Sequence, residues 1–161
     1  MARKNVIPDK EFQEACRVIA ENDLVAQYAA LHTCDIVEKP WWMPWKNLST
    51  TLNNTIYLAK GWRDWSLAPH LAHEATHLLQ QHDMGMSAFL ASYAQKPGRL
   101  RLELAAHKVE LRVYRYLFPN ANVPELENDI VRRLATNYAF GDWFDKIMQW
   151  RAVQYLRGDD T

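Results

Sequence analysis

The sequence His73-Glu74-Ala75-Thr76-His77 places two histidines four residues apart, inside a segment whose apolar residues recur at helical spacing. On an α-helix, residues i and i+4 lie one turn apart on one face, so both imidazoles can reach a single zinc ion. Glu74 follows the first histidine, where its carboxylate can accept a proton from a metal-bound water. This pattern therefore predicts a helix that carries a metal site.

Signals on both sides of the motif set the expected length of this helix. Asp64 and Ser66 are candidate N-cap residues, and Pro69 is tolerated in a first turn. Gly85 lies where a helix would end. The sequence predicts a helix from about residue 66 to about residue 82, with the motif in its middle.

The rest of the chain predicts a small sheet followed by helices. Apolar periodicity favours helices over residues 9–31 (with a break near Asn22-Asp23), 86–95, 99–118, 123–140 and 142–156. Strands are expected over residues 33–38 and 55–59, with residues 40–52 as a connection and Asn53-Asn54 as a turn. We expect one α+β domain over residues 1–161, mostly helical, with a small antiparallel or mixed β-sheet preceding the motif helix.

Charge and composition limit the partners and the compartment. The chain has 19 acidic and 19 basic residues, so no net charge favours nucleic acid or an anionic membrane. Residues 1–10 lack the apolar run of a secretory signal, and no segment has the roughly 20 apolar residues of a membrane span. Cys16 and Cys34 indicate two reduced thiols, with a disulfide as the open alternative. We expect a cytoplasmic protein.

Aromatic residues are abundant, with seven Trp, seven Tyr and five Phe. They are densest at residues 41–45, where Trp41, Trp42 and Trp45 flank Met43 and Pro44. This segment has two interpretations. It is either part of an aromatic core or a patch that docks a protein partner or overhangs a cleft.

A catalytic zinc site needs a third protein ligand, and several residues are candidates. His70 lies two turns before His77, which suits a cap or a supporting hydrogen bond better than the same ion. Asp83 has the spacing of the third ligand in metzincins, but Gln80 stands where those sites have glycine, and His82 is one residue short of that spacing.

The segment 99–118 offers a stronger set. Glu103, His107 and Glu110 occupy positions i, i+4 and i+7, so they share one face of the expected helix. Charged groups on a partly apolar face need partners, which a metal ion and the motif histidines can supply. Glu103 is the first choice as ligand; His107 and Glu110 are alternative ligands or supporting residues. The competing interpretation is a solvated polar stripe.

The stretch from His73 to Gln81 resembles the H-E-x-T-H-x-x-Q-Q motif of small predicted zinc metallopeptidases of bacteria and their phages, which are related to the gluzincins. The strand at residues 54–58, the following Trp62 and the segment 102–106 are similar to further elements of that family. The resemblance covers residues 45–110. It implies a zincin-like fold with His73, His77 and Glu103 on zinc and Glu74 as base, and with virion association if the protein is phage-encoded.

Three functions agree with these residues. The first is zinc-dependent hydrolysis of a peptide or protein, in which Ile56, Tyr57 and Leu58 bind the substrate if their strand is a sheet edge. The second is a non-catalytic structural or interaction protein that binds zinc. The third is hydrolysis of a non-peptide amide such as a cell-wall bond. For the enzyme, the donor to the developing negative charge stays open among Tyr57, Tyr93, His107, Tyr114 and Tyr138.

Overall fold

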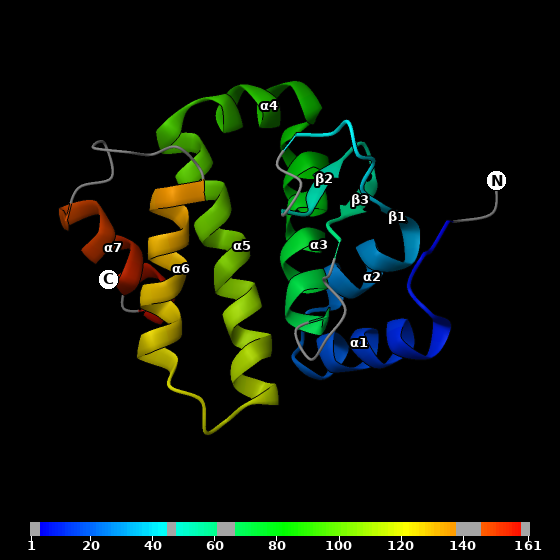
Figure 1. Ribbon diagram of the computed structural model, residues 1–161, viewed down its shortest axis with the longest axis horizontal. Coiled ribbons are helices and arrows are strands. Elements are labelled where there is room, and N and C mark those ends of the chain that lie inside the picture. The colour runs from blue at the N-terminus through cyan, green and yellow to red at the C-terminus, as the bar shows by residue number, and fades with distance from the viewer. Residues whose placement is uncertain (1–3, 45–47, 61–66, 138–145, 159–161) are drawn as a thin grey trace.

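The computed structural model describes residues 4–44, 48–60, 67–137 and 146–158. Its helices and strands are ordered α1 (Asp9–Glu21), α2 (Val25–Thr33), β1 (Asp35–Glu38), β2 (Thr50–Leu52), β3 (Thr55–Leu58), α3 (Leu67–Met84), α4 (Met86–Ala94), α5 (Lys96–Leu117), α6 (Val123–Asn137) and α7 (Lys146–Arg157). The fold is α+β and mostly helical, with a small mixed sheet before the motif helix, as the sequence predicts (Figure 1).

The sheet has β3 in its centre. Its strand order is β1-β3-β2, with β1 parallel to β3 and β2 antiparallel to it. The β2–β3 hairpin turns on Asn53 and Asn54, whose φ angles of 48° and 59° are those of a type I′ turn. The outer side of β1 is covered by the segment around Asn5, which bridges to Ile36. The remaining edge of the sheet is β2.

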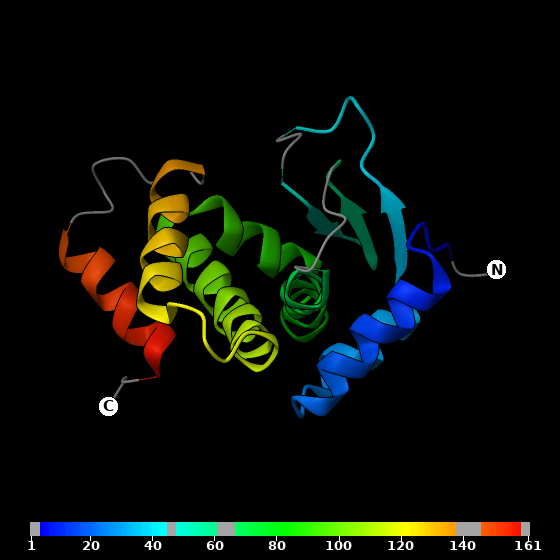
Figure 2. The same cartoon turned by 60° about the horizontal axis from the view of Figure 1, so that its bottom comes forward.

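Helix α3 lies between the sheet and α5, while α1 and α2 pack on another of its sides (Figure 2). Its apolar residues Leu71, Ala72 and Ala75 are fully buried, in a core shared with the sheet and the first two helices. Burial around most of its circumference explains why the polar residues of the motif are also buried: His73, Glu74, Thr76, His77 and Gln81.

Helices α5, α6 and α7 enclose a second hydrophobic cluster. Leu104 and Leu111 of α5 contribute to it, together with Ile130, Leu134 and Leu156. Val113 of α5 belongs to the first cluster, so α5 packs on both sides. The corner before α5 is tight, because a Cβ on Gly98 would lie 2.2 Å from the carbonyl oxygen of Ser92. Pro97 is accepted within the first turn, so α5 begins at Lys96 rather than at residue 99.

Most predicted elements are present, with one notable difference in the first half of the chain. The expected helical break is real: α1 ends at Glu21, and Asp23 has a φ of 57°. Residues 50–52, however, form strand β2 rather than part of a connection. The prediction missed the β-branched pair Thr50-Thr51, which stands one residue before the two-residue Asn53-Asn54 turn and is a hairpin signal. The proposed caps Asp64 and Ser66 lie outside the described residues.

Other sequence expectations meet mixed outcomes. Cys16 and Cys34 are both buried, and no disulfide joins them. Trp41 and Trp42 are 81% and 66% exposed, so these two do not fill a core, and Trp45 lies outside the described residues. Among the described helices, none is long and apolar enough to cross a membrane.

A buried carboxylate joins the helices that carry the second cluster. Glu127 of α6 accepts hydrogen bonds from Arg115 of α5 (2.8 Å) and from Arg157 of α7 (2.7 Å). The Glu127 side chain is 2% exposed, whereas both arginines are more than a third exposed. This interaction fixes α5 against α6 and α7.

We expect Glu127→Gln to lower the free energy of unfolding by about 1–2 kcal/mol, because the amide loses the charge-assisted bonds while solvent screens the two arginines. Urea denaturation measures this change. Asp129→Asn on the same helix removes only exposed ion pairs and should cost less than about 0.5 kcal/mol. Equal losses in the two variants would contradict the assigned role of Glu127.

Candidate metal centre

Two histidines of α3 and a glutamate of α5 converge in the interior. His73 Nε2 and His77 Nε2 lie 3.2 Å apart. The Glu103 carboxylate faces both, with Oε2 3.5 Å from His73 Nε2 and Oε1 3.6 Å from His77 Nε2. All three residues are buried. The contact between α3 and α5 thus brings together the three residues that the sequence suggested as metal ligands.

The other nitrogen of each motif histidine has an acceptor. His73 Nδ1 donates to Glu110 Oε2 at 3.1 Å, and His77 Nδ1 donates to Gln80 Oε1 at 2.8 Å. The Gln80 amide is oriented by its own bond to the Leu102 carbonyl of α5 (3.0 Å). With both Nδ1 protons committed, each imidazole can offer the lone pair of Nε2 to a shared metal ion once Nε2 carries no proton.

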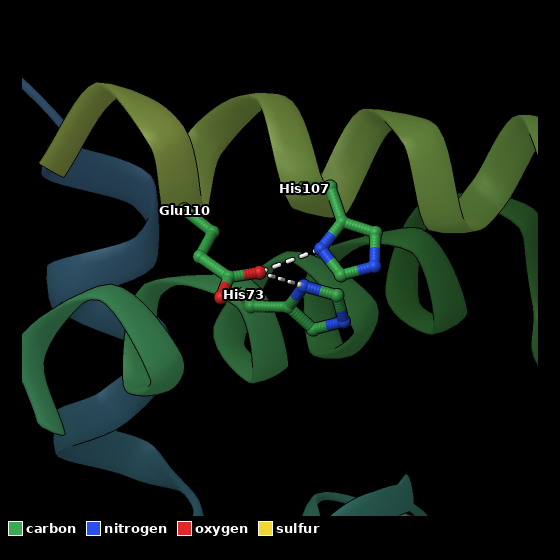
Figure 3. A group of neighbouring side chains, drawn as sticks. All are labelled: His73, His107 and Glu110. Carbon is green, nitrogen blue, oxygen red and sulfur yellow. Dashed lines mark hydrogen bonds and ion pairs between the residues drawn. The ribbon is translucent and has the colours of Figure 1, made fainter. Parts of the chain in front are cut away.

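His107 lies beside this set without joining it. Its Nδ1 donates to Glu110 Oε2 at 2.6 Å, so one carboxylate oxygen receives two imidazole N–H groups (Figure 3). His73, His107 and Glu110 form a second group with ligand atoms within 4.8 Å of one another. Because Glu110 Oε2 is already the acceptor for both rings, this group serves best as a support that orients His73.

Buried charge shifts the protonation of the cluster. Burial opposes a charge on His73, but the nearby carboxylates of Glu103 and Glu110 outweigh this and raise its pKa to about 10. Burial likewise opposes the negative charge of Glu103, yet His77 and His73 hold its pKa well below the ordinary range. The buried carboxylate of Glu103 and the partly buried one of Glu110 therefore require compensating positive charge, which protons or a divalent cation can provide.

The spacing of the donor atoms fits a zinc ion. Bond lengths of about 2.0–2.2 Å at tetrahedral angles place neighbouring ligand atoms roughly 3.3–3.5 Å apart. The observed separations are 3.2, 3.5 and 3.6 Å. Glu103 Oε2 is buried and lacks a hydrogen-bond partner among the described residues, which leaves a lone pair for an ion. Two imidazoles and one carboxylate are also a donor set that zinc accepts.

The Glu74 carboxylate is held in position by a residue of the sheet. Its Oε2 accepts a hydrogen bond of 2.6 Å from the hydroxyl of Thr51 in β2. Thr51 and Glu74 are both buried, although both line a cleft. Because one carboxylate oxygen is occupied, the second is the atom that can accept a proton in the cleft.

The cleft has a volume of about 420 Å³ and contains the candidate ligands. One wall is the β2 edge with the residues before it, Leu48 to Leu52, and another is α4, which contributes Phe89, Leu90 and Tyr93. His73, His77, Glu74 and Glu103 all contribute to its lining. A fourth ligand position therefore opens to a space of the size that holds a small ligand or part of a peptide.

Tyr93 is the tyrosine that approaches the centre. Its hydroxyl donates to Glu103 Oε1 at 2.6 Å, and burial together with that carboxylate raises its pKa. Tyr57 and Tyr114 do not line the cleft, and Tyr138 lies outside the described residues. His107 does not line it either.

Other predicted residues lie elsewhere. His70 bonds Ser49 through Nε2 (2.7 Å) and supports the segment before β2, which agrees with a supporting role. Asp83 and His82 are exposed and contact each other. The expected substrate edge formed by Ile56, Tyr57 and Leu58 is wrong: β3 is paired on both sides, and Ile56 and Leu58 are fully buried.

The sequence reasoning missed the residues that β2 contributes. Thr51 and the wall formed by residues 48–52 were assigned to a connection, so no contact with Glu74 was expected. The roles of Gln80 and Gln81 were also missed, although both end the nine-residue motif His73–Gln81. Their i+3 spacing from His77 and i+7 spacing from Glu74 place them on the faces of those residues, which was the available signal.

No family model matches the chain, and neither a curated protein nor a solved structure matches it. The resemblance to zinc metallopeptidases therefore rests on the sequence pattern within residues 45–110 and stays a prediction.

The donor geometry predicts one zinc ion per chain. We expect purified protein dialysed against trace zinc to contain about one equivalent by atomic emission, and His77→Ala to lose it because two protein donors hold zinc weakly. His82→Ala, an exposed histidine near the end of the same helix, should retain the metal. Metal-free wild-type protein would rule out the centre.

Proposed function

We propose that this protein is a zinc-dependent metallopeptidase that hydrolyses peptide bonds. The observation that carries this proposal is the convergence of His73 Nε2, His77 Nε2 and the Glu103 carboxylate at zinc-ligand spacing, at an open cleft. Glu74 lines the same cleft beside them. Three protein ligands with one open position and an adjacent carboxylate are typical of catalytic rather than structural zinc.

The residues have separate roles in the proposed reaction. A bound zinc ion would supply Lewis acidity that makes water more acidic and polarises the substrate carbonyl. Glu74 accepts a proton from the attacking water through the oxygen that Thr51 does not hold, and passes it to the leaving amine nitrogen. Tyr93 is the candidate donor to the carbonyl oxygen as negative charge develops on it.

Substrate binding is assigned to β2 in place of β3. β2 is the uncovered edge of the sheet and forms a wall of the cleft, so an extended peptide can add to it as a further strand. Lys39 holds the segment before β2 in place, because its Nζ donates to the Leu48 carbonyl and to the Thr50 hydroxyl, both at 2.7 Å.

A non-catalytic zinc protein is the second candidate. Exposed Trp41 and Trp42 favour it, since they offer an apolar surface for a partner. The open cleft and the hydrogen-bonded Glu74 favour the enzyme, because a structural site normally has four protein ligands and gains nothing from a base.

The two candidates differ in the behaviour of Glu74→Gln. For the enzyme, we expect this variant to keep its zinc and its thermal stability while its cleavage of an internally quenched peptide library falls about 10²–10⁴-fold. Glu38→Gln, an exposed glutamate at the end of β1, is the matched control and should cleave like wild type. Cleavage that survives in Glu74→Gln would refute the proposed mechanism.

Tyr93→Phe tests the donor to the developing negative charge. We expect kcat to fall about 10–10³-fold with KM little changed, because the hydroxyl acts mainly in the transition state. Zinc content should stay at wild-type level, since the Glu103 carboxylate is retained. Tyr116→Phe removes an exposed hydroxyl on α5 and provides the control. An effect of Tyr93→Phe on KM alone would assign Tyr93 to ground-state binding instead.

A further inference from the structure

Gln81, the last residue of the motif, is bonded to the edge of the sheet in the manner of a neighbouring strand. Its Nε2 donates to the Thr51 carbonyl (2.8 Å), and its Oε1 accepts from the Asn53 backbone N–H (3.2 Å). Gln81 is 6% exposed; its bond to Thr51 is buried and its bond to Asn53 is partly buried. One side-chain amide thus occupies a backbone acceptor and a backbone donor two residues apart.

These two backbone groups lie on the outward side of β2. Leu52 and Thr55 flank the two-residue turn and pair with each other, and alternate residues of an antiparallel strand direct their peptide groups to opposite sides. The carbonyl of Thr51 therefore points away from β3, to the side where another strand would bond. Gln81 takes the positions that an added peptide would need there.

Before Thr51, the outward backbone groups of the β2 edge are not bonded by Gln81. The same alternation places the peptide groups of Ser49 and the N–H of Thr51 on that side, and none of the hydrogen bonds among the described residues engages them. Leu48 to Leu52 line the cleft that contains Glu74. The Thr51 hydroxyl contacts Glu74 directly, which places the reacting bond near Thr51.

We propose that Gln81 ends the substrate-pairing edge at Thr51, so that the enzyme recognises the main chain of a peptide on one side of the cleaved bond only. This inference rests on the proposed peptidase function. On the Ser49 side, the substrate backbone pairs with the edge. On the Asn53 side, Gln81 excludes it, and residues beyond the cleaved bond contribute little to binding. Substrates are then peptides that need an extended segment on a single side of the bond.

The test uses zinc-loaded full-length protein and a quenched peptide with blocked termini that wild type cleaves at one bond. Single N-methyl groups are placed at the second to fourth residues on either side of that bond, where each removes one backbone donor. We expect kcat/KM to fall about 3- to 10-fold at one or more positions on one side and less than 2-fold on the other. Equal losses on both sides would overturn the proposal.

The second part of the test repeats the N-methyl scan with the variant Gln81→Met. It keeps the length of the side chain and frees the Thr51 carbonyl and the Asn53 N–H, so we expect the previously insensitive side to acquire a 3- to 10-fold response to N-methylation. A purely structural Gln81 would lower kcat/KM for all peptides equally, which contradicts the proposal. Gln13→Met, on an exposed position of α1, is the control and should keep the one-sided wild-type profile.

The outcomes also separate this inference from the proposed function. Zinc-loaded wild type that cleaves no peptide in the library overturns both. Wild type that cleaves peptides with a two-sided profile retains the function and overturns the inference alone. If Gln81→Met does not fold, as judged by its thermal transition, the wild-type profile decides by itself.

Discussion

The packing of α3 against α5 is the contact on which the candidate site depends. It packs two buried histidines from one helix against the buried Glu103 and the partly buried Glu110 of the other, and carboxylates removed from water must find compensating charge. Glu103 faces the Nε2 atoms, while Glu110 holds the far side of His73. The two helices are also fixed from outside, by the core under α3 and by Glu127 behind α5. The positions of the donor atoms follow from this packing and not from any one element.

Each polar residue of the stretch from His73 to Gln81 has a distinct partner. Gln80 orients His77 and contacts α5, Thr76 bonds back to the Ala72 carbonyl, and Gln81 ties the helix to the edge of the sheet. The helix is therefore linked to two other elements, α5 and β2, through side chains spaced along a few turns. A cleft between β2 and α4 is the consequence, since both walls are fixed relative to the same helix.

The strand β2 shows where sequence patterns were insufficient. It has only three residues, Thr50 to Leu52, which is too short for an alternation to stand out, and the preceding Pro- and Trp-rich segment favoured a connection. Missing this strand moved the expected sheet edge to β3 and hid Thr51 beside Glu74. By contrast, α3 and α5 are long enough for periodicity to predict them, and the shared face of Glu103, His107 and Glu110 was readable from spacing.

The sequence by itself determined the helical periodicity, the one-turn separation of His73 and His77, and the location of candidate ligands on the segment 99–118, because these are properties of a single helix. Only the tertiary structure decided among the residues of that segment. The rotation of α5 against α3 directs Glu103 to both Nε2 atoms and places Glu110 beside His73 Nδ1, and a helix pattern carries no information on that rotation. Which strand is the edge was likewise decided by pairing between segments, which depends on contacts that local propensity does not encode.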